Sequence, residues 1–162
     1  DAQELFWKVI QAFSGTELDV SIYKHPMMSL EIILIMIEDQ LPKNIGFSDE
    51  PTYKGLSKCD LVITTGSNMS TNALKVGLPV ISVVRTIGLT FEPLDWFESP
   101  ISYCARPEQI REEADRLLSI SEDKRLQNSI RGKNLSEDCL GRIDYKIMDS
   151  FMLKMSRTQV GV

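Results

Sequence analysis

The sequence is poor in the residue types that build metal sites and disulfide frameworks. Its 162 residues include one histidine and three cysteines, Cys59, Cys104 and Cys139, and no Cys-x-x-Cys pair occurs. An odd number of cysteines without that pairing argues against a zinc site and against a disulfide-stapled scaffold. A reducing, cytoplasmic setting fits this composition. No D-x-D motif follows a predicted strand, so we expect neither a metal ion nor another cofactor.

Positive charge and long apolar runs are also scarce. Lys and Arg number 18 against 23 Asp and Glu, which leaves a net charge of −5 and no basic run. This balance argues against a nucleic-acid partner. The most apolar stretch, 30–37, is too short to span a bilayer and contains Glu31. An anionic ligand would therefore have to be held locally, by backbone amides, hydroxyl groups and a few cationic side chains.

Helical and strand patterns alternate along the chain. Apolar and β-branched runs predict strands over 18–24, 44–48, 60–65, 79–84 and 101–105. Apolar residues at helical spacing, with Gly or Pro at the segment ends, predict helices over 2–13, 28–40, 50–58, 67–77 and 107–120. One or two more helices are predicted between 122 and 155. The inner face of the helix at 107–120 is predicted to consist of Ile110, Ala114, Leu117 and Leu118.

This order of elements predicts the fold class. Strands that alternate with helices form a mostly parallel sheet with right-handed crossovers. We therefore expect a Rossmann-like three-layer α/β/α fold, with residues 1–162 as a single domain and a carboxy-terminal helix over about 138–155.

A loop of small hydroxylated residues follows the strand at 60–65. The first turn of a helix carries amides without internal partners and a partial positive charge, and a glycine lets a ligand approach the backbone. The loop therefore predicts a cradle for a nucleotide phosphate, built from Thr65, Gly66, Ser67, Asn68, Ser70 and Thr71. In the alternative, Ser67 or Asn68 only caps the helix. Neither a Walker loop nor a G-x-G-x-x-G motif is present, which argues against a dinucleotide cofactor.

The lone histidine stands in a second loop at a strand end. Lys24, His25 and Pro26 follow the strand at 18–24, and the proline biases His25 toward an extended conformation. An imidazole here could donate to a phosphate or protonate a leaving group, with Lys24 adding charge. Taken alone, His25 also fits an ordinary loop histidine. A role in phosphate binding is favoured because His25 is expected at the same sheet edge as the loop from Thr65 to Thr71.

Other candidates follow the strands at 44–48 and 79–84. Arg85 could pair with a phosphate or a sugar carboxylate, or form an ordinary surface ion pair. Glu92 could bind ribose hydroxyls and Trp96 could stack on a base, although both could equally belong to the packing of their own loop. The segment 48–50 could reach a nucleobase or simply start the next helix.

The segments "YKHP" and "CDLVITTGSNMSTNALKVGLPVISV" together resemble the carboxy-terminal, donor-binding half of GT-B glycosyltransferases. In particular, they are similar to bacterial surface-carbohydrate and capsule enzymes that use CMP-activated sugars, such as sialyl- and Kdo-transferases. His25-Pro26 would be the HP motif, and Gly66-Ser67 with Ser70-Thr71 the Ser/Thr motif. The resemblance implies that His25 contacts the donor phosphate and supports departure of CMP. It also implies that Ser67, Ser70 and Thr71 bind that phosphate.

The resemblance carries further expectations about partners and completeness. It implies a nucleotide-sugar donor, a glycan or lipid-linked acceptor and an amino-terminal GT-B domain outside this chain, so we expect a fragment of a two-domain enzyme. The full-length protein would be cytoplasmic or peripheral at the inner membrane, and an exposed cleft wall would favour self-association. Three alternatives stay open: a non-catalytic module that binds a nucleotide or a phosphorylated metabolite, an interaction domain, and a flavodoxin-like fold.

Overall fold

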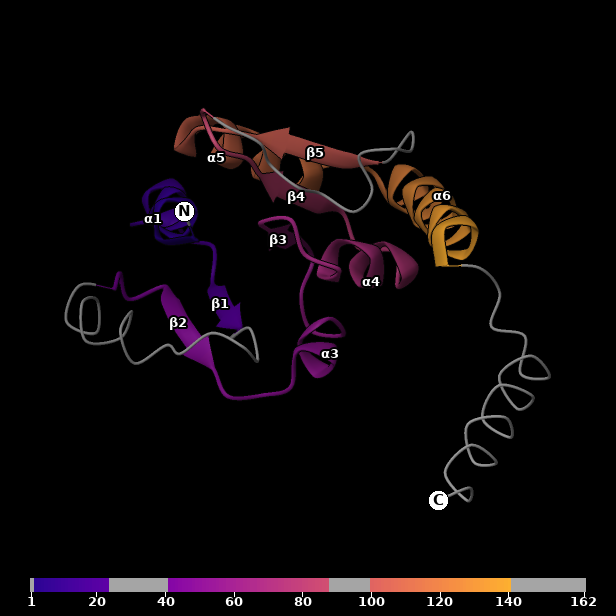
Figure 1. Cartoon of the computed structure of the whole chain (residues 1–162), viewed down its shortest axis with the longest axis horizontal. Helices are drawn as coiled ribbons and strands as arrows, with labels where there is room; N and C mark the ends of the chain where they lie inside the picture. The colour runs from indigo at the N-terminus through magenta and orange to yellow at the C-terminus, as the bar shows by residue number, and fades with distance from the viewer. Residues whose placement is uncertain (1, 24–40, 88–99, 141–162) are drawn as a thin grey trace, which may run out of the picture.

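The computed structural model describes residues 2–23, 41–87 and 100–140 (Figure 1). The predicted helix at 28–40 lies outside these ranges, as does the predicted carboxy-terminal helix beyond residue 140. The described elements are α1 (Ala2–Phe13), β1 (Val20–Tyr23), β2 (Ile45–Ser48), α3 (Thr52–Gly55), β3 (Val62–Thr64), α4 (Met69–Lys75), β4 (Val80–Val83), β5 (Ile101–Cys104), α5 (Pro107–Leu118) and α6 (Glu122–Leu140).

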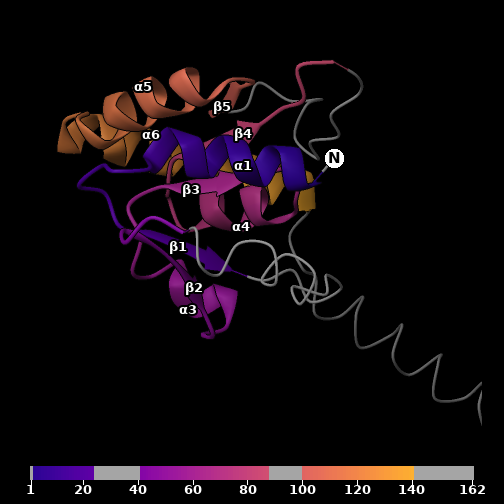
Figure 2. The same cartoon turned by 90° about the vertical axis from the view of Figure 1, so that its left-hand side faces the viewer.

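All strand pairings among the described residues are parallel, and they form two sheets. The first sheet pairs β1 with β2, from Val20 opposite Ile45 to Tyr23 opposite Ser48. The second has the order β3-β4-β5, and the first residue of β4, Val80, lies opposite both Val62 and Ile101. Figures 1 and 2 both place β1 between β2 and β3, so the two sheets lie edge to edge.

Helix α1 shows that the strands of both sheets run in the same direction. At its carboxyl end, the Phe13 carbonyl accepts a hydrogen bond from Asn44 Nδ2 (2.9 Å), and Asn44 immediately precedes β2. Nearer its amino end, Lys8 Nζ donates to the carbonyl of Val84 (3.4 Å), which immediately follows β4. The helix therefore runs antiparallel to the strands of both sheets, and the carboxyl ends of β1, β3 and β4 share one edge.

Helices cover both faces of the β3-β4-β5 sheet, and α1 also covers one face of β1 and β2. On one face, α1 and α5 pack together over a core that includes Phe13, Ile45, Ile81, Val83 and Ile110. On the other face, α4 and α6 pack together over a smaller core of Ala73, Leu74, Val80 and Ile101. The predicted α/β/α layering with a parallel sheet is therefore confirmed.

Two helix boundaries show how the local sequence sets these elements. The end of α4 depends on Gly77, whose φ of 85° is a left-handed conformation that glycine adopts without strain, and its N–H donates to the Leu74 carbonyl at 2.9 Å. At the start of α5, Pro107 occupies the first turn and Gln109 Oε1 accepts the N–H of Arg106 (3.2 Å). The predicted inner face of α5 is confirmed at Ile110, Ala114 and Leu117, whereas Leu118 is only half-buried.

Two elements are shorter than predicted: the helix predicted at 50–58 is reduced to the four residues of α3, and the strand predicted at 60–65 is reduced to β3. The apolar run at 60–65 predicted a strand covered on both sides, yet β3 has three residues, and Val62 and Ile63 are only half-buried. The neighbouring β4, paired on both edges, is buried at every residue. None of the helices in the described ranges is both long enough and apolar enough to cross a membrane.

Candidate functional site

The candidate site lies at the shared carboxyl edge of the strands. In open α/β sheets, ligands bind outside the carboxyl ends of the strands. The loop from Thr65 to Asn68 leaves β3 at this edge and enters α4, and Arg85 follows β4 at the same edge. Predicted site residues from two strand ends are therefore brought to one side of the molecule.

The β3–α4 loop is held by its own hydrogen bonds. Gly66 has a φ of 73°, a left-handed conformation that disfavours any residue with a Cβ. Ser67 Oγ accepts the N–H of Met69 (3.3 Å), and the Ser67 carbonyl accepts both the N–H of Ser70 (3.0 Å) and its hydroxyl (2.8 Å). Asn68 stands at the N-cap of α4 but makes no side-chain cap hydrogen bond. The capping alternative therefore holds in part for Ser67 and not for Asn68.

The loop side chains differ in how far they reach solvent. Thr65 and Asn68 are exposed and Ser67 is half-buried, whereas Ser70 and Thr71 are 0% and 5% exposed. A bound anion at this surface would therefore meet Thr65, Gly66, Ser67 and Asn68 first. Ser70 contributes from inside, because its hydroxyl binds the loop carbonyl.

Beneath this loop lies one buried hydroxyl with no hydrogen-bond partner among the described residues, Thr64 Oγ1. Thr64 ends β3 and is only 7% exposed. It alternates with Ile63, which faces α1, and so lies on the face that α4 covers, like its register partner Ser82. Buried polar atoms normally have a partner, so an unpartnered hydroxyl at a candidate site is a notable feature.

Several predicted site residues lie outside the described ranges: Lys24, His25, Pro26, Glu92 and Trp96. Arg85 is described and exposed. In the segment 48–50, Glu50 forms an ion pair with Lys58 (2.6 Å), and this hydrogen bond raises the pKa of the Lys58 ammonium. Ser48 Oγ accepts the N–H of Glu50 (3.3 Å). These contacts favour the local structural role for the segment.

Cys59 and Cys104 lack the properties of reactive cysteines. Burial raises the pKa of the Cys59 and Cys104 thiols, which keeps both protonated at neutral pH. The described residues also contain no group of three His, Cys, Asp or Glu side chains that could hold a metal ion.

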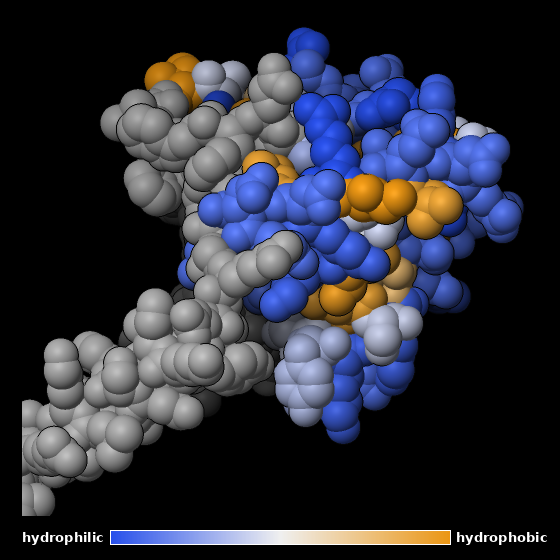
Figure 3. Space-filling view, turned by 90° about the vertical axis from the view of Figure 1, so that its right-hand side faces the viewer, coloured by the Kyte–Doolittle hydropathy of each residue, from blue (hydrophilic) through white to orange (hydrophobic). Residues whose placement is uncertain are grey.

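Sequence patterns gave no sign of a groove between α3 and α4. It has a volume of about 560 Å³, and Figure 3 shows hydrophobic atoms on this side of the molecule. The exposed side chains of Tyr53 (71%) and Val76 (55%) belong to it. Because α3 is only four residues long, no helical periodicity could have shown which side of Tyr53 stays open. The groove is lined by Tyr53, Leu56, Ser57, Cys59, Met69, Asn72, Lys75, Val76 and Leu78.

A comparison with solved structures finds proteins of similar fold. The chain is similar to the crystal structure of CalG4, the calicheamicin glycosyltransferase, with a TM-score of 0.57 and 20% sequence identity. The match covers 89% of this chain and 40% of that one, so this chain spans less than half the length of CalG4. No family model and no curated protein sequence matches. The likeness shows the fold, a Rossmann-like α/β architecture as in one half of a GT-B glycosyltransferase.

Proposed function

We propose that this chain is the donor-binding domain of a glycosyltransferase. The proposed reaction moves a sugar from a nucleotide-activated, CMP-linked donor to a glycan acceptor of a bacterial surface polysaccharide or capsule. The observation that carries the proposal is the β3–α4 loop, in which left-handed Gly66 and the polar side chains of Thr65, Ser67 and Asn68 stand at the carboxyl edge of a parallel sheet. The choice of CMP and of the pathway rests on the sequence motifs at His25-Pro26 and Gly66–Thr71.

In this proposal the loop binds the donor phosphate through its most accessible groups. Gly66 lets the phosphate approach the backbone, and Thr65, Ser67 and Asn68 supply hydrogen-bond donors. Ser70 holds the loop in place, because its hydroxyl binds the Ser67 carbonyl at 2.8 Å. Thr64 and Thr71 line the buried side of the same segment.

His25, with Lys24 beside it, would act on the leaving group. When the bond between sugar and phosphate breaks, negative charge develops on the departing nucleotide. A histidine that donates to that phosphate stabilises this charge, and the cationic Lys24 adds to the effect. Arg85 follows β4 at the same edge and would bind the phosphate or a sugar carboxylate. A monophosphate leaving group needs less charge compensation than a diphosphate.

Transfer itself requires a second domain that binds the glycan or lipid-linked acceptor. The role proposed for residues 1–162 is therefore donor binding and departure of the nucleotide. Sugar transfer is proposed only for the complete two-domain protein.

Ligand-observed NMR or calorimetry with CMP, CDP and UDP tests the proposal. Ser67→Ala and His25→Ala should both weaken binding of CMP. Ser14→Ala is the matched control, because exposed Ser14 follows α1 at the opposite, amino edge of the sheets. Preference for UDP or CDP would change the donor class. No binding of any of the three at millimolar concentration would contradict the proposal. Tight binding that both variants leave unchanged would favour a nucleotide-binding module with a different site.

A further inference from the structure

The groove between α3 and α4 takes no part in the proposed function. Its volume of about 560 Å³ lies within the range of about 300–1,000 Å³ that is typical of small-molecule sites. Apolar, aromatic and sulfur-containing side chains dominate its lining, and the polar side chains that join them are Ser57, Asn72 and Lys75. Predominantly apolar walls with a few polar groups are the usual composition of a ligand pocket. We call this feature the α3/α4 groove.

One wall of the α3/α4 groove is the outer face of α4. Met69, Asn72 and Val76 line it, at the spacing of three and four residues that places side chains on one helix face. The residues between them, Ala73 and Leu74, are buried against the sheet at 0% and 2% exposure. Because packing fixes the inner face of α4, its outer face forms a preformed wall.

The opposite wall comes from α3 and the residues that follow it, and it includes an uncovered aromatic ring. Gly55 is buried beside the ring of Tyr23 in β1, where a Cβ would clash. Tyr53 precedes Gly55 by two positions, so it lies on the other side of this short helical turn, and it is 71% exposed. Met69 and Cys59 bring sulfur atoms to the same groove. Sulfur atoms make favourable contacts with aromatic rings, so these walls suit an aromatic ligand.

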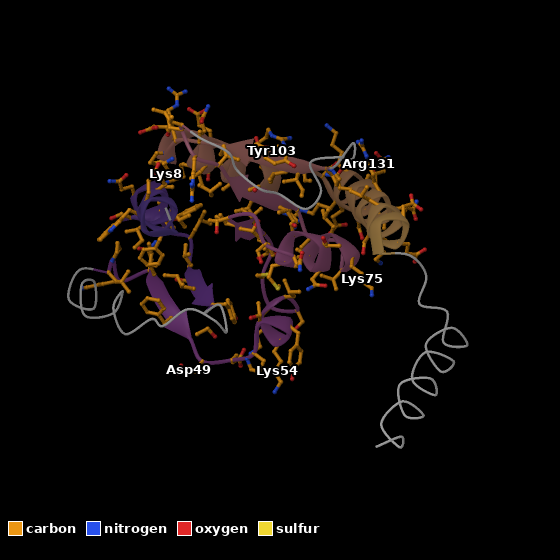
Figure 4. All side chains as sticks on the ribbon, in the orientation of Figure 1. Lys8, Asp49, Lys54, Lys75, Tyr103 and Arg131 are labelled. Atoms are coloured by element: carbon orange, nitrogen blue, oxygen red, sulfur yellow. The ribbon has the colours of Figure 1, made fainter. Side chains whose placement is uncertain are left out.

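The charge of the groove is set by one residue. Lys75 is the only charged side chain among the described residues that line it, and it projects from α4 as an exposed ammonium group (Figure 4). Within the described ranges no hydrogen bond or ion pair engages this ammonium, whereas Lys8 and Lys58 are paired with glutamates. Asn72 lies three residues before Lys75 on the same helix, so its amide can donate beside the ammonium. In a chain of net charge −5, this local set of donors favours an anionic group.

We propose that the α3/α4 groove is a second binding site, separate from the β3–α4 loop, for a small aromatic molecule that carries one anionic group. The aromatic part lies between Tyr53 and Met69, and the anionic group binds the ammonium of Lys75 and the amide of Asn72. The apolar walls exclude water around this ion pair and so strengthen it. Ser67 of the β3–α4 loop precedes α4, whereas Lys75 ends it, so the two anion-binding positions are at opposite ends of one helix. This site goes beyond donor binding and does not depend on it.

Fluorescence titration of the 162-residue chain with two probes tests this site. The first probe, 8-anilinonaphthalene-1-sulfonate, carries aromatic rings and an anionic sulfonate, and the second, N-phenyl-1-naphthylamine, has the same rings without the charge. Lys75→Gln removes the cation, with Lys43→Gln, an exposed lysine before β2, as the matched control. Tyr53→Ser removes the aromatic wall, with Leu126→Ser, 61% exposed on α6, as the matched control. All four positions are exposed, so the variants should keep the fold.

The parent chain should bind the sulfonate probe more tightly than the uncharged probe. Lys75→Gln should weaken binding of the sulfonate by about threefold or more and leave the uncharged probe unchanged, because this substitution removes only the ion pair. Tyr53→Ser should weaken binding of both probes by about threefold or more, because both use the aromatic wall. Neither control variant should change the affinity for either probe.

Three results would overturn the proposal: no binding of the sulfonate at millimolar concentration, a sulfonate affinity that Lys75→Gln or Tyr53→Ser leaves unchanged, or equal weakening by Lys43→Gln or Leu126→Ser. Saturating CMP should not displace the sulfonate, because the β3–α4 loop lies at the other end of α4. Displacement by CMP would overturn the assignment of a second site. A failure of CMP to bind would contradict only the proposed function.

Discussion

Lys8 of α1 donates a hydrogen bond to the carbonyl oxygen of Val84, 3.4 Å away and 76 residues later in the sequence. The same ammonium group also donates to Thr86 Oγ1 (3.1 Å) and pairs with Glu4 (3.0 Å). These contacts join the first helix to the loop that follows β4, on either side of Arg85. They place α1 at the edge where the candidate phosphate loop also lies, so the packing of α1 and the shape of this edge are connected.

Replacing Thr64 with valine should stabilise the nucleotide-free chain. Its hydroxyl is buried and has no partner among the described residues, so valine removes a desolvated polar group and keeps the shape. We expect the free energy of unfolding, measured with urea, to rise by about 1 kcal/mol. Ser70→Ala is the comparison: it loses the hydrogen bond to the Ser67 carbonyl and should lower stability by about 1 kcal/mol. A loss of stability in Thr64→Val would show that its hydroxyl has a partner.

Replacing Gly66 with alanine should destabilise the candidate phosphate loop. Its φ of 73° places a Cβ in a strained left-handed conformation, which costs about 1 kcal/mol. Gly46→Ala is the control, because a Cβ there meets no atom within 4 Å and its φ is not left-handed. Denaturant unfolding of both variants measures the difference. Equal stability of the two would contradict the assigned conformation of Gly66.

The side chain of Asn44 should contribute strongly to stability at the edge of the sheet where β1 and β2 begin. Its Nδ2 lies 2.9 Å from the carbonyl oxygens of both Phe13 and Leu18, and 3.3 Å from Thr16 Oγ1. Asn44→Ala removes one donor from all three acceptors, although the Phe13 carbonyl keeps the N–H of Thr16 and Thr16 Oγ1 keeps the N–H of Leu18. The loss should lower the free energy of unfolding by about 1–3 kcal/mol.

Thermal or urea unfolding measures this loss, with the exposed Asn128→Ala of α6 as control. If Asn44→Ala and Asn128→Ala unfold alike, the three contacts do not contribute to stability.

Acid should weaken the contact between α5 and β5 through Glu113. Hydrogen bonds from Arg116 and then from Ser102 lower the pKa of this carboxyl below its usual 4.5. A lowered pKa in the folded state gives stability that is complete above the unfolded pKa and is lost as the pH falls through the folded one.

The stability advantage of the parent chain over Glu113→Gln should therefore be constant near neutral pH and shrink below about pH 4.5. Urea unfolding at a series of pH values measures it, with Glu112→Gln of the same helix as control. An advantage that stayed unchanged down to pH 3 would contradict the assigned pairing.

Local patterns predicted most elements of this fold because each depends on nearby residues. The helix at 2–13 was predicted with the bounds that α1 has, and the strand at 79–84 contains β4. The burial of Ile110, Ala114 and Leu117 follows from helical spacing along α5 alone. The start of α4 was predicted two residues early, because Ser67 uses its side chain within the loop instead of entering the helix.

The candidate site was predictable in its residue types and not in its exposure. The sequence shows a run of small polar residues around Gly66, which indicates an anion-binding loop. It does not show that Ser70 and Thr71 are buried while Thr65 and Asn68 are exposed, because that depends on how α4 packs against β3 and β4. The orphaned hydroxyl of Thr64 and the groove beside Tyr53 depend on the same packing.

By itself, then, the sequence determined the order of helices and strands, the parallel α/β class and the position of a polar loop at a strand end, since each follows from short-range periodicity and turn residues. Only the tertiary structure shows that the described strands pair as β1-β2 and β3-β4-β5, and that Lys8 reaches Val84 across the edge. Strand pairing and layer packing join residues that are far apart in the chain, and their geometry is set by which surfaces are buried together.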